Sequence, residues 1–193
     1  MRRFFLALAT LATALCIAGP ASAGDSFLVD SGTHSRASTL DFYIPVDGLF
    51  IGTYTHFGVG VWYGYPIVAD GFISALNDAF YIEGGAAVER YSWSVGWGSN
   101  CSESWWRVSP MAGVRWDFNI TPKFTAFLNA KLGYGVGFGD NYDCGGVKYT
   151  GSGASLSEVK YITSVGGYYR FSDSWALRFD LGNFDAVGIG THL

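Results

Sequence analysis

Apolar and polar residues alternate along the chain from Lys123 to Phe138. Every even position from Phe124 to Phe138 is apolar or aromatic, whereas the odd positions include Lys123, Asn129 and Lys131. A period of two predicts a β-strand, and this one is much longer than the usual strand of about five or six residues. A strand that crosses a membrane needs about ten such residues, because its backbone pairs with neighbouring strands while one face meets lipid.

The same alternation recurs elsewhere, with the charged residues confined to one face of each segment. These further segments are 57–65, 80–89, 106–120, 159–171 and 175–181. Two weaker segments, 38–46 and 186–193, bring the total to eight, an even number that closes an up-and-down barrel with both ends on one side. The pattern therefore predicts an all-β, transmembrane antiparallel barrel of eight strands, with six or ten strands as open alternatives.

The connections between these segments alternate between short and long. Tight turns are expected at 119–123 and 171–174, and long loops rich in glycine and serine at 94–105 and 139–156. Short turns are typical of the periplasmic end of an outer-membrane barrel, and long loops of its extracellular end. The connection at 66–79 then lies on the periplasmic side and is longer than usual.

Aromatic residues recur at intervals of about one membrane thickness on the apolar faces. Pairs ten residues apart rise roughly 25 Å at the strand tilt of a barrel, which is the height of its apolar band. These residues predict two aromatic girdles at the membrane interfaces: Trp106, Trp116, Phe124, Tyr134, Tyr161, Phe171 and Trp175.

The N-terminus has the pattern of a cleaved secretory signal. Arg2 and Arg3 precede an apolar run that ends at Gly19 and Pro20, and small residues follow at 21–23. We therefore expect a signal peptide at 1–23, an N-terminal periplasmic segment at 24–37, and a barrel at 38–193 in the bacterial outer membrane.

Composition narrows the classes of function. An aromatic content of 18% with 27 glycines suits a closed sheet better than a secreted β-sandwich, which is the competing fold. Without Arg2 and Arg3, 10 of the 12 basic residues remain against 16 acidic ones, which argues against nucleic acid as a partner. The expected partners are outer-membrane lipid and lipopolysaccharide, and the barrel is expected to be a monomer.

The signal, the alternating strands of about ten residues and the aromatic girdles resemble the small outer-membrane β-barrels, the class of the OmpA transmembrane domain and OmpX. The resemblance is architectural and covers most of the chain after residue 23. It implies a barrel of eight strands. The chain departs from the usual pattern of this class at its end, where Leu193 stands in place of an aromatic residue.

Two cysteines lie in the two long loops, which the strand order places on the same side. An exported chain passes through an oxidising compartment, so we expect a disulfide between Cys101 and Cys144. Unpaired thiols are less compatible with export. A zinc site is disfavoured because neither cysteine has a second ligand at a suitable spacing. No cofactor or metal is expected.

Many charged residues fall on the inward faces of the segments. A barrel of eight strands is just wide enough to be filled by side chains, so these residues predict a salt-bridged plug, with a narrow pore as the alternative. The expected interior network comprises Glu83, Glu89, Arg107, Arg115, Asp117, Lys131, Glu158, Lys160, Arg170, Arg178 and Asp180.

Catalysis is a weaker hypothesis. Some small barrels modify lipid with serine, histidine and acidic residues, but His34, His56 and His192 belong to no nucleophile motif. We therefore expect no enzyme, and a structural or surface-interaction role. An extracellular ligand could bind through the loops 94–105 and 139–156, whose aromatic residues could equally belong to the girdle.

Overall fold

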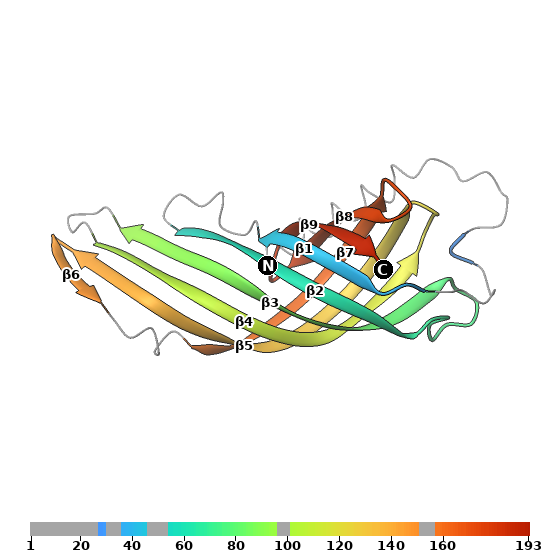
Figure 1. Cartoon of the computed structure of the whole chain (residues 1–193), viewed down its shortest axis with the longest axis horizontal. Coiled ribbons are helices and arrows are strands. Elements are labelled where there is room, and N and C mark those ends of the chain that lie inside the picture. Colours follow the sequence, from blue (N-terminus) through green and yellow to red (C-terminus); the bar gives the residue numbers. More distant parts are fainter. Residues whose placement is uncertain (1–26, 30–35, 46–53, 96–100, 151–156) are drawn as a thin grey trace.

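The computed structural model of the chain describes residues 27–29, 36–45, 54–95, 101–150 and 157–193. The regular elements of these residues are all strands (Figure 1). None of the described residues forms a helix long and apolar enough to cross a membrane. The strands are β1 (Thr39–Pro45), β2 (Tyr54–Val68), β3 (Asp78–Val95), β4 (Cys101–Asn119), β5 (Phe124–Cys144), β6 (Val147–Thr150), β7 (Glu158–Arg170), β8 (Trp175–Gly182) and β9 (Ala186–His192).

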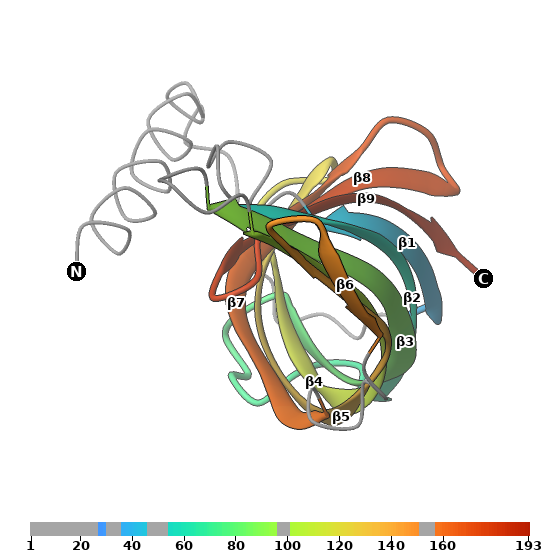
Figure 2. The same ribbon diagram turned by 90° about the vertical axis from the view of Figure 1, so that its left-hand side faces the viewer.

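Eight of these strands close into a ring, which is visible end-on in Figure 2. Each strand pairs antiparallel with the next, and β1 pairs with β9 so that the first and last strands meet. The ring also closes on its far side, where β4 pairs with β5 along most of their length. β6 lies outside the ring and extends β5 as a hairpin. The predicted fold, an up-and-down antiparallel barrel of eight strands, is confirmed.

The wall of the barrel is much taller on one side than on the other. β3, β4 and β5 contain 18, 19 and 21 residues, whereas β1 and β9 contain 7 each. The long strands continue past the ring as a protruding sheet with β6, at the left of Figure 1. We call this end the extended end, and the opposite end, with the turns at 120–123 and 171–174, the turn end.

The protruding sheet corrects the prediction of two long loops at 94–105 and 139–156. Residues 101–105 belong to β4, residues 139–144 to β5 and residues 147–150 to β6. Alternation is weak in these stretches, but each strand continues because its neighbour supplies hydrogen-bonding partners along the same length. The predicted turn near 47–48 lies outside the described residues.

A bulge in β5 sets the direction of its last side chains. β4 and β5 pair in register up to Trp106 with Phe138, and resume at Ser104 with Asn141, so one extra residue of β5 lies between these pairs. Gly139 lies there with φ of +65°, a backbone conformation that suits glycine at a bulge. Because one extra residue reverses the alternation, Cys144 comes to lie directly opposite Cys101.

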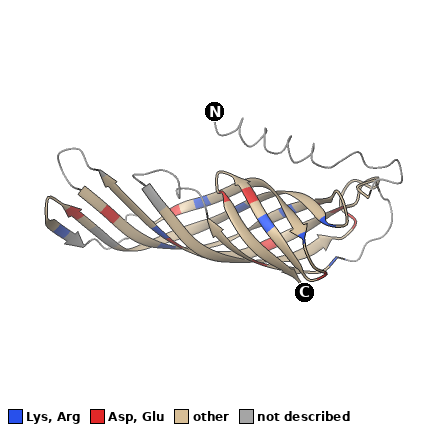
Figure 3. Ribbon diagram, turned by 90° about the horizontal axis from the view of Figure 1, so that it is seen from above, with Lys and Arg blue, Asp and Glu red and all other residues tan. Residues whose placement is uncertain are grey.

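Within the ring, apart from the bulges, side chains alternate between the outside and the lumen of the barrel. The outward positions are exposed and largely apolar, for example Leu128, Leu132 and Val159 at 51%, 62% and 66% exposure. The inward positions are buried and include most of the charged residues of the strands, whose positions along the ribbon are shown in Figure 3. An apolar outside and a polar inside reverse the usual order of a soluble protein.

Candidate functional site

The lumen is filled by three layers of side chains, and the layer nearest the turn end is charged. Glu83 is its centre: Oε2 lies 2.6 Å from Lys131 Nζ, and Oε1 lies 3.2 Å from Arg178 Nη1 and also pairs with Arg115. Arg115 and Arg178 are each 1% exposed or less. Such a cluster is tolerated in a barrel interior because every charge has an opposite charge beside it.

Asp41 belongs to this lower layer, although it was not among the interior charges expected from the sequence. It is fully buried, and its Oδ2 accepts hydrogen bonds of 2.8 Å from both Arg178 Nη1 and the Tyr168 hydroxyl. The signal was present in the sequence, because Asp41 alternates with Leu40 and Phe42, whose side chains were expected to point outward.

The middle layer of the lumen is apolar and aromatic, and the expected salt-bridged plug did not include it. Tyr43 and Trp62 stack with ring centroids 5.3 Å apart, and Phe184 packs against Tyr43 edge-on. Glycines make room for these large rings: a Cβ at Gly60 would clash with the ring of Tyr43. The buried members of the layer are Tyr43, Trp62, Ala87, Met111, Ile162, Phe184 and Ala186.

The layer nearest the extended end is charged again. Glu89 is fully buried, and both of its oxygens lie 2.6 Å from Lys160 Nζ. Its Oε1 also lies 3.2 Å from His56 Nε2, and its Oε2 lies 3.6 Å from Arg107 Nε. Arg107 in turn pairs with Glu158 at the rim. A charged, an apolar and a second charged layer therefore follow one another along the lumen.

The charges within the lumen balance among the described residues. Five acidic side chains, each in an ion pair, stand against five basic ones. The acidic residues are Asp41, Glu83, Glu89, Asp117 and Asp180, and the basic ones are Arg107, Arg115, Lys131, Lys160 and Arg178. Balanced and paired charges favour a packed lumen, because a conducting pore usually carries a ring of one sign of charge.

Arg170 is the exception among the residues expected in the network. It lies at the mouth of the turn end, where its Nη1 donates to the carbonyl oxygen of Pro122 at 3.4 Å. It forms no ion pair with the other charges in the described part of the chain. Its strand, β7, reaches the mouth at this residue, so its inward direction leads to solvent and not to the packed lumen.

The histidines are not arranged as a catalytic site where the structure describes them. His56 Nε2 faces Glu89, and its ring stacks on Tyr91 with centroids 4.3 Å apart, in the upper charged layer. Ser109 Oγ donates to Glu89 Oε2 at 3.4 Å, so the carboxylate separates the serine from the histidine. His192 lies at the turn end, and His34 lies outside the described residues. The described ranges also contain no group of three possible metal ligands.

The protruding sheet carries aromatic residues on its concave face. Trp105 stacks on Tyr91 with centroids 5.3 Å apart and planes 9° apart, and Tyr91 is itself buried at the top of the lumen. Trp93 Nε1 donates to Glu103 Oε2 at 2.5 Å across the β3–β4 pair. The bulge at Gly139 turns Tyr142 toward the same face, opposite Glu103. We call Tyr91, Trp93, Trp105 and Tyr142 the aromatic shelf.

A disulfide between Cys101 and Cys144 ties the far ends of β4 and β5 together beyond the shelf. It closes a segment of 43 residues, for which loop entropy in the unfolded chain gives about 4 kcal/mol. The covalent bond stiffens the part of the sheet that has lost the support of the closed ring.

The seven residues expected in the girdles lie on the outward face of the barrel. Trp116, Phe124, Phe171 and Trp175 are near the turn end, since β4 and β5 turn into each other after Asn119 and β7 into β8 after Arg170. Trp106, Tyr134 and Tyr161 lie further along, toward the extended end. Between the two groups, the outward positions are occupied by residues such as Leu128, Leu132 and Leu177.

The fold defines the class of protein: a small antiparallel β-barrel of eight strands with an apolar outside and a packed lumen, the architecture of the small outer-membrane barrels. Comparisons with protein families and with curated proteins find no match.

Two solved structures of Ail, the attachment invasion locus protein of Yersinia pestis, are similar to the chain. Ail in complex with the heparin analogue sucrose octasulfate is 12% identical, with 81% of this chain and 97% of that chain covered and a TM-score of 0.42. Ail alone is 10% identical, with 82% and 100% covered and a TM-score of 0.44. At these values the likeness is one of general fold.

Proposed function

We propose that the chain is a cell-surface binding protein of the outer membrane. Residues 1–23 then act as a signal peptide that directs export and is cleaved off. The turn end then lies in the periplasm with the segment 24–37, and the extended end projects outside the cell. The apolar band between the girdles contacts lipid and lipopolysaccharide, and the single barrel needs no partner subunit. The reversed order of apolar and polar side chains supports this placement, because only lipid suits such an outside.

The observation that carries a binding function is the protruding sheet with its aromatic shelf. A barrel needs strands only long enough to cross the membrane, yet β5 has 21 residues. The surplus is ordered by pairing, by β6 and by a disulfide. Aromatic side chains exposed outside the membrane lower the solubility of a protein. Their presence on an ordered sheet is therefore best explained by a ligand that binds them. The packed rings and paired charges of the lumen argue against transport as the function.

The chemistry of the shelf favours a saccharide as the ligand. The indole of Trp105 offers a flat apolar face, and Tyr91 holds it in place by stacking. Glu103 supplies carboxylate oxygens beside Trp93. A sugar ring has an apolar face of C–H groups and a rim of hydroxyl donors, so it matches an aromatic plane flanked by a hydrogen-bond acceptor.

Binding of a glycan array by the barrel in lipid nanodiscs tests the proposal. We expect saturable binding of at least one glycan, with Trp105→Ala and Glu103→Gln each weakening it tenfold or more. Trp175→Ala, which removes an indole from the outward face at the turn end, is the matched control and keeps full binding. Absence of any bound glycan, or equal binding by wild type and Trp105→Ala, contradicts the proposal.

A further inference from the structure

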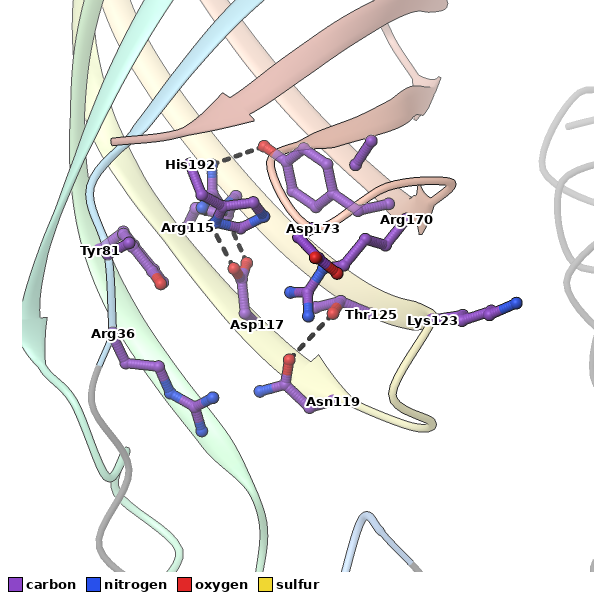
Figure 4. Close-up of a pocket in the computed structure, with 13 residues that line it drawn as sticks. Arg36, Tyr81, Arg115, Asp117, Asn119, Lys123, Thr125, Arg170, Asp173 and His192 are labelled. Carbon is purple, nitrogen blue, oxygen red and sulfur yellow. Dashed lines mark hydrogen bonds and ion pairs between the residues drawn. The ribbon is translucent and has the colours of Figure 1, made fainter.

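The turn end of the barrel contains a cavity of about 270 Å³ that opens away from the lumen (Figure 4). This volume holds a small anion or the charged group of a larger molecule, since a water molecule takes about 30 Å³ of liquid. The cavity lies at the opposite end of the molecule from the aromatic shelf. Its wall includes Arg36, Arg115, Arg170 and His192, together with two carboxylates, Asp117 and Asp173.

The charged side chains on the inner wall of the cavity are paired with one another. Asp117 Oδ1 accepts from Arg115 Nε at 2.7 Å, and Asp117 Oδ2 accepts from Arg115 Nη2 at 3.1 Å. Arg115 Nη1 donates onward to the Tyr168 hydroxyl at 2.7 Å and also pairs with Glu83. The cavity therefore ends at the lower charged layer.

Two arginines at the rim form no ion pair with any carboxylate of the residues that the structure describes. Arg36 Nε donates to the carbonyl oxygen of Ala69 at 3.1 Å, and its Nη2 donates to Asn77 Oδ1 at 2.5 Å. These neutral acceptors fix the guanidinium and leave its charge in place. No acidic side chain of the described ranges pairs with Arg36 within the 4 Å of an ion pair.

Arg170 has a similar environment on the other side of the cavity. Its Nη1 makes one long hydrogen bond, 3.4 Å, to the carbonyl oxygen of Pro122, and its buried Nε has no hydrogen-bond partner. It too lacks an ion pair in the described part of the chain. Figure 4 shows the guanidinium groups of Arg36 and Arg170 directed toward the cavity from opposite sides, whereas Lys123 points away from it.

We propose that this cavity binds an oxyanion, a phosphate or carboxylate group, between Arg36 and Arg170. A guanidinium presents planar N–H donors that match two oxygens of such a group, and the buried Nε of Arg170 is a donor that such an oxygen would satisfy. His192 lies on the same wall and offers a further ring nitrogen. The inference does not depend on the proposed function, because the cavity and the aromatic shelf share no residue.

Titration of the detergent-solubilised barrel, observed through the Nε–H signals of its arginines by NMR, tests the site. Inorganic phosphate and acetate are added in separate series, with sodium chloride adjusted to keep ionic strength constant. We expect the Arg170 signal to shift and saturate in at least one series. Saturation in the phosphate series alone identifies a phosphate group as the ligand, and saturation in the acetate series alone identifies a carboxylate.

Variants distinguish a specific binding site from nonspecific attraction of anions to positive charge. Arg36→Met and Arg170→Met are expected to weaken binding tenfold or more, and Arg170→Lys, which keeps the charge without the planar donors, to weaken it less than Arg170→Met. Lys123 also lines the cavity, but its side chain points away from it in Figure 4, so Lys123→Met removes the same charge without removing a donor and is expected to bind as the wild type does.

Three results would overturn the proposal. The first is no saturable shift with either anion, and the second is a loss of affinity in Lys123→Met as large as in Arg170→Met. The third is unchanged affinity in the variant that lacks both arginines. A gel-mobility comparison of heated and unheated samples shows that each variant is folded, and Arg170→Lys preserves the test if Arg170→Met does not fold.

Discussion

The pair of Glu83 and Lys131 in the lower charged layer leads to an asymmetric prediction. Glu83 is the only carboxylate that pairs with Lys131 in the described part of the chain, but Glu83 itself also pairs with Arg115 and Arg178. Glu83→Gln leaves the ammonium group of Lys131, which is 4% exposed, without an opposite charge. We expect this substitution to lower the free energy of unfolding by about 3 to 5 kcal/mol.

The reverse substitution is expected to cost far less. Lys131→Met leaves Glu83 with two guanidinium groups, and the new side chain packs toward the ring of Trp62, which lies 4.9 Å from Lys131 Nζ. We expect a loss below about 2 kcal/mol, because a buried ion replaced by an apolar side chain of similar volume is often close to neutral. The double variant should then be more stable than Glu83→Gln alone.

Equilibrium unfolding by urea in phospholipid vesicles, followed by tryptophan fluorescence, measures these differences. Two results would contradict this asymmetry. In the first, Lys131→Met is as destabilising as Glu83→Gln, and in the second, the double variant is the least stable of the three. Either result means that the carboxylate does not act as the shared partner of three cations.

Three further predictions concern the lumen and the wall. Gly60→Ala should destabilise the barrel, because the new Cβ meets the ring of Tyr43. Gly84→Ala should not destabilise it, because no atom lies within 4 Å of the new Cβ. Equilibrium unfolding of both variants in vesicles measures the difference. Leu128→Arg, midway along the outward band, should cost about 2 to 4 kcal/mol in the same assay, and Val147→Arg in β6 close to none. Planar bilayers containing the wild-type barrel should show no ion current, because the three layers fill the lumen; steady single-channel currents would contradict this.

Much of the barrel could be predicted from alternation alone, because a period of two assigns each side chain to a face once the strand is recognised. The inward direction of Glu83, Arg115 and Lys131 followed from the apolar residues on either side of them. Asp41 followed the same rule, but its short segment made the strand less evident. Strand order then came from the short turns, because antiparallel neighbours need only a few residues between them.

Three features could not be predicted, because they depend on contacts between distant strands. The bulge at Gly139 shows in the sequence only as one glycine among many, yet it decides which face Tyr142 and Cys144 share. The middle apolar layer depends on Phe184, which belongs to the β8–β9 turn and folds into the lumen against Tyr43. The cavity at the turn end joins Arg36 and Arg170, which are far apart in the chain.

Refolding of the chain from residue 24 onward tests the central claim, a barrel whose outer face is built for lipid. Protein diluted from urea into phosphatidylcholine vesicles is compared with protein diluted into buffer alone, by flotation and by gel mobility with and without heating. We predict that the protein floats with the vesicles and shows a heat-dependent mobility shift, and that it aggregates in buffer. A soluble, monomeric, folded protein in buffer without lipid or detergent would contradict it.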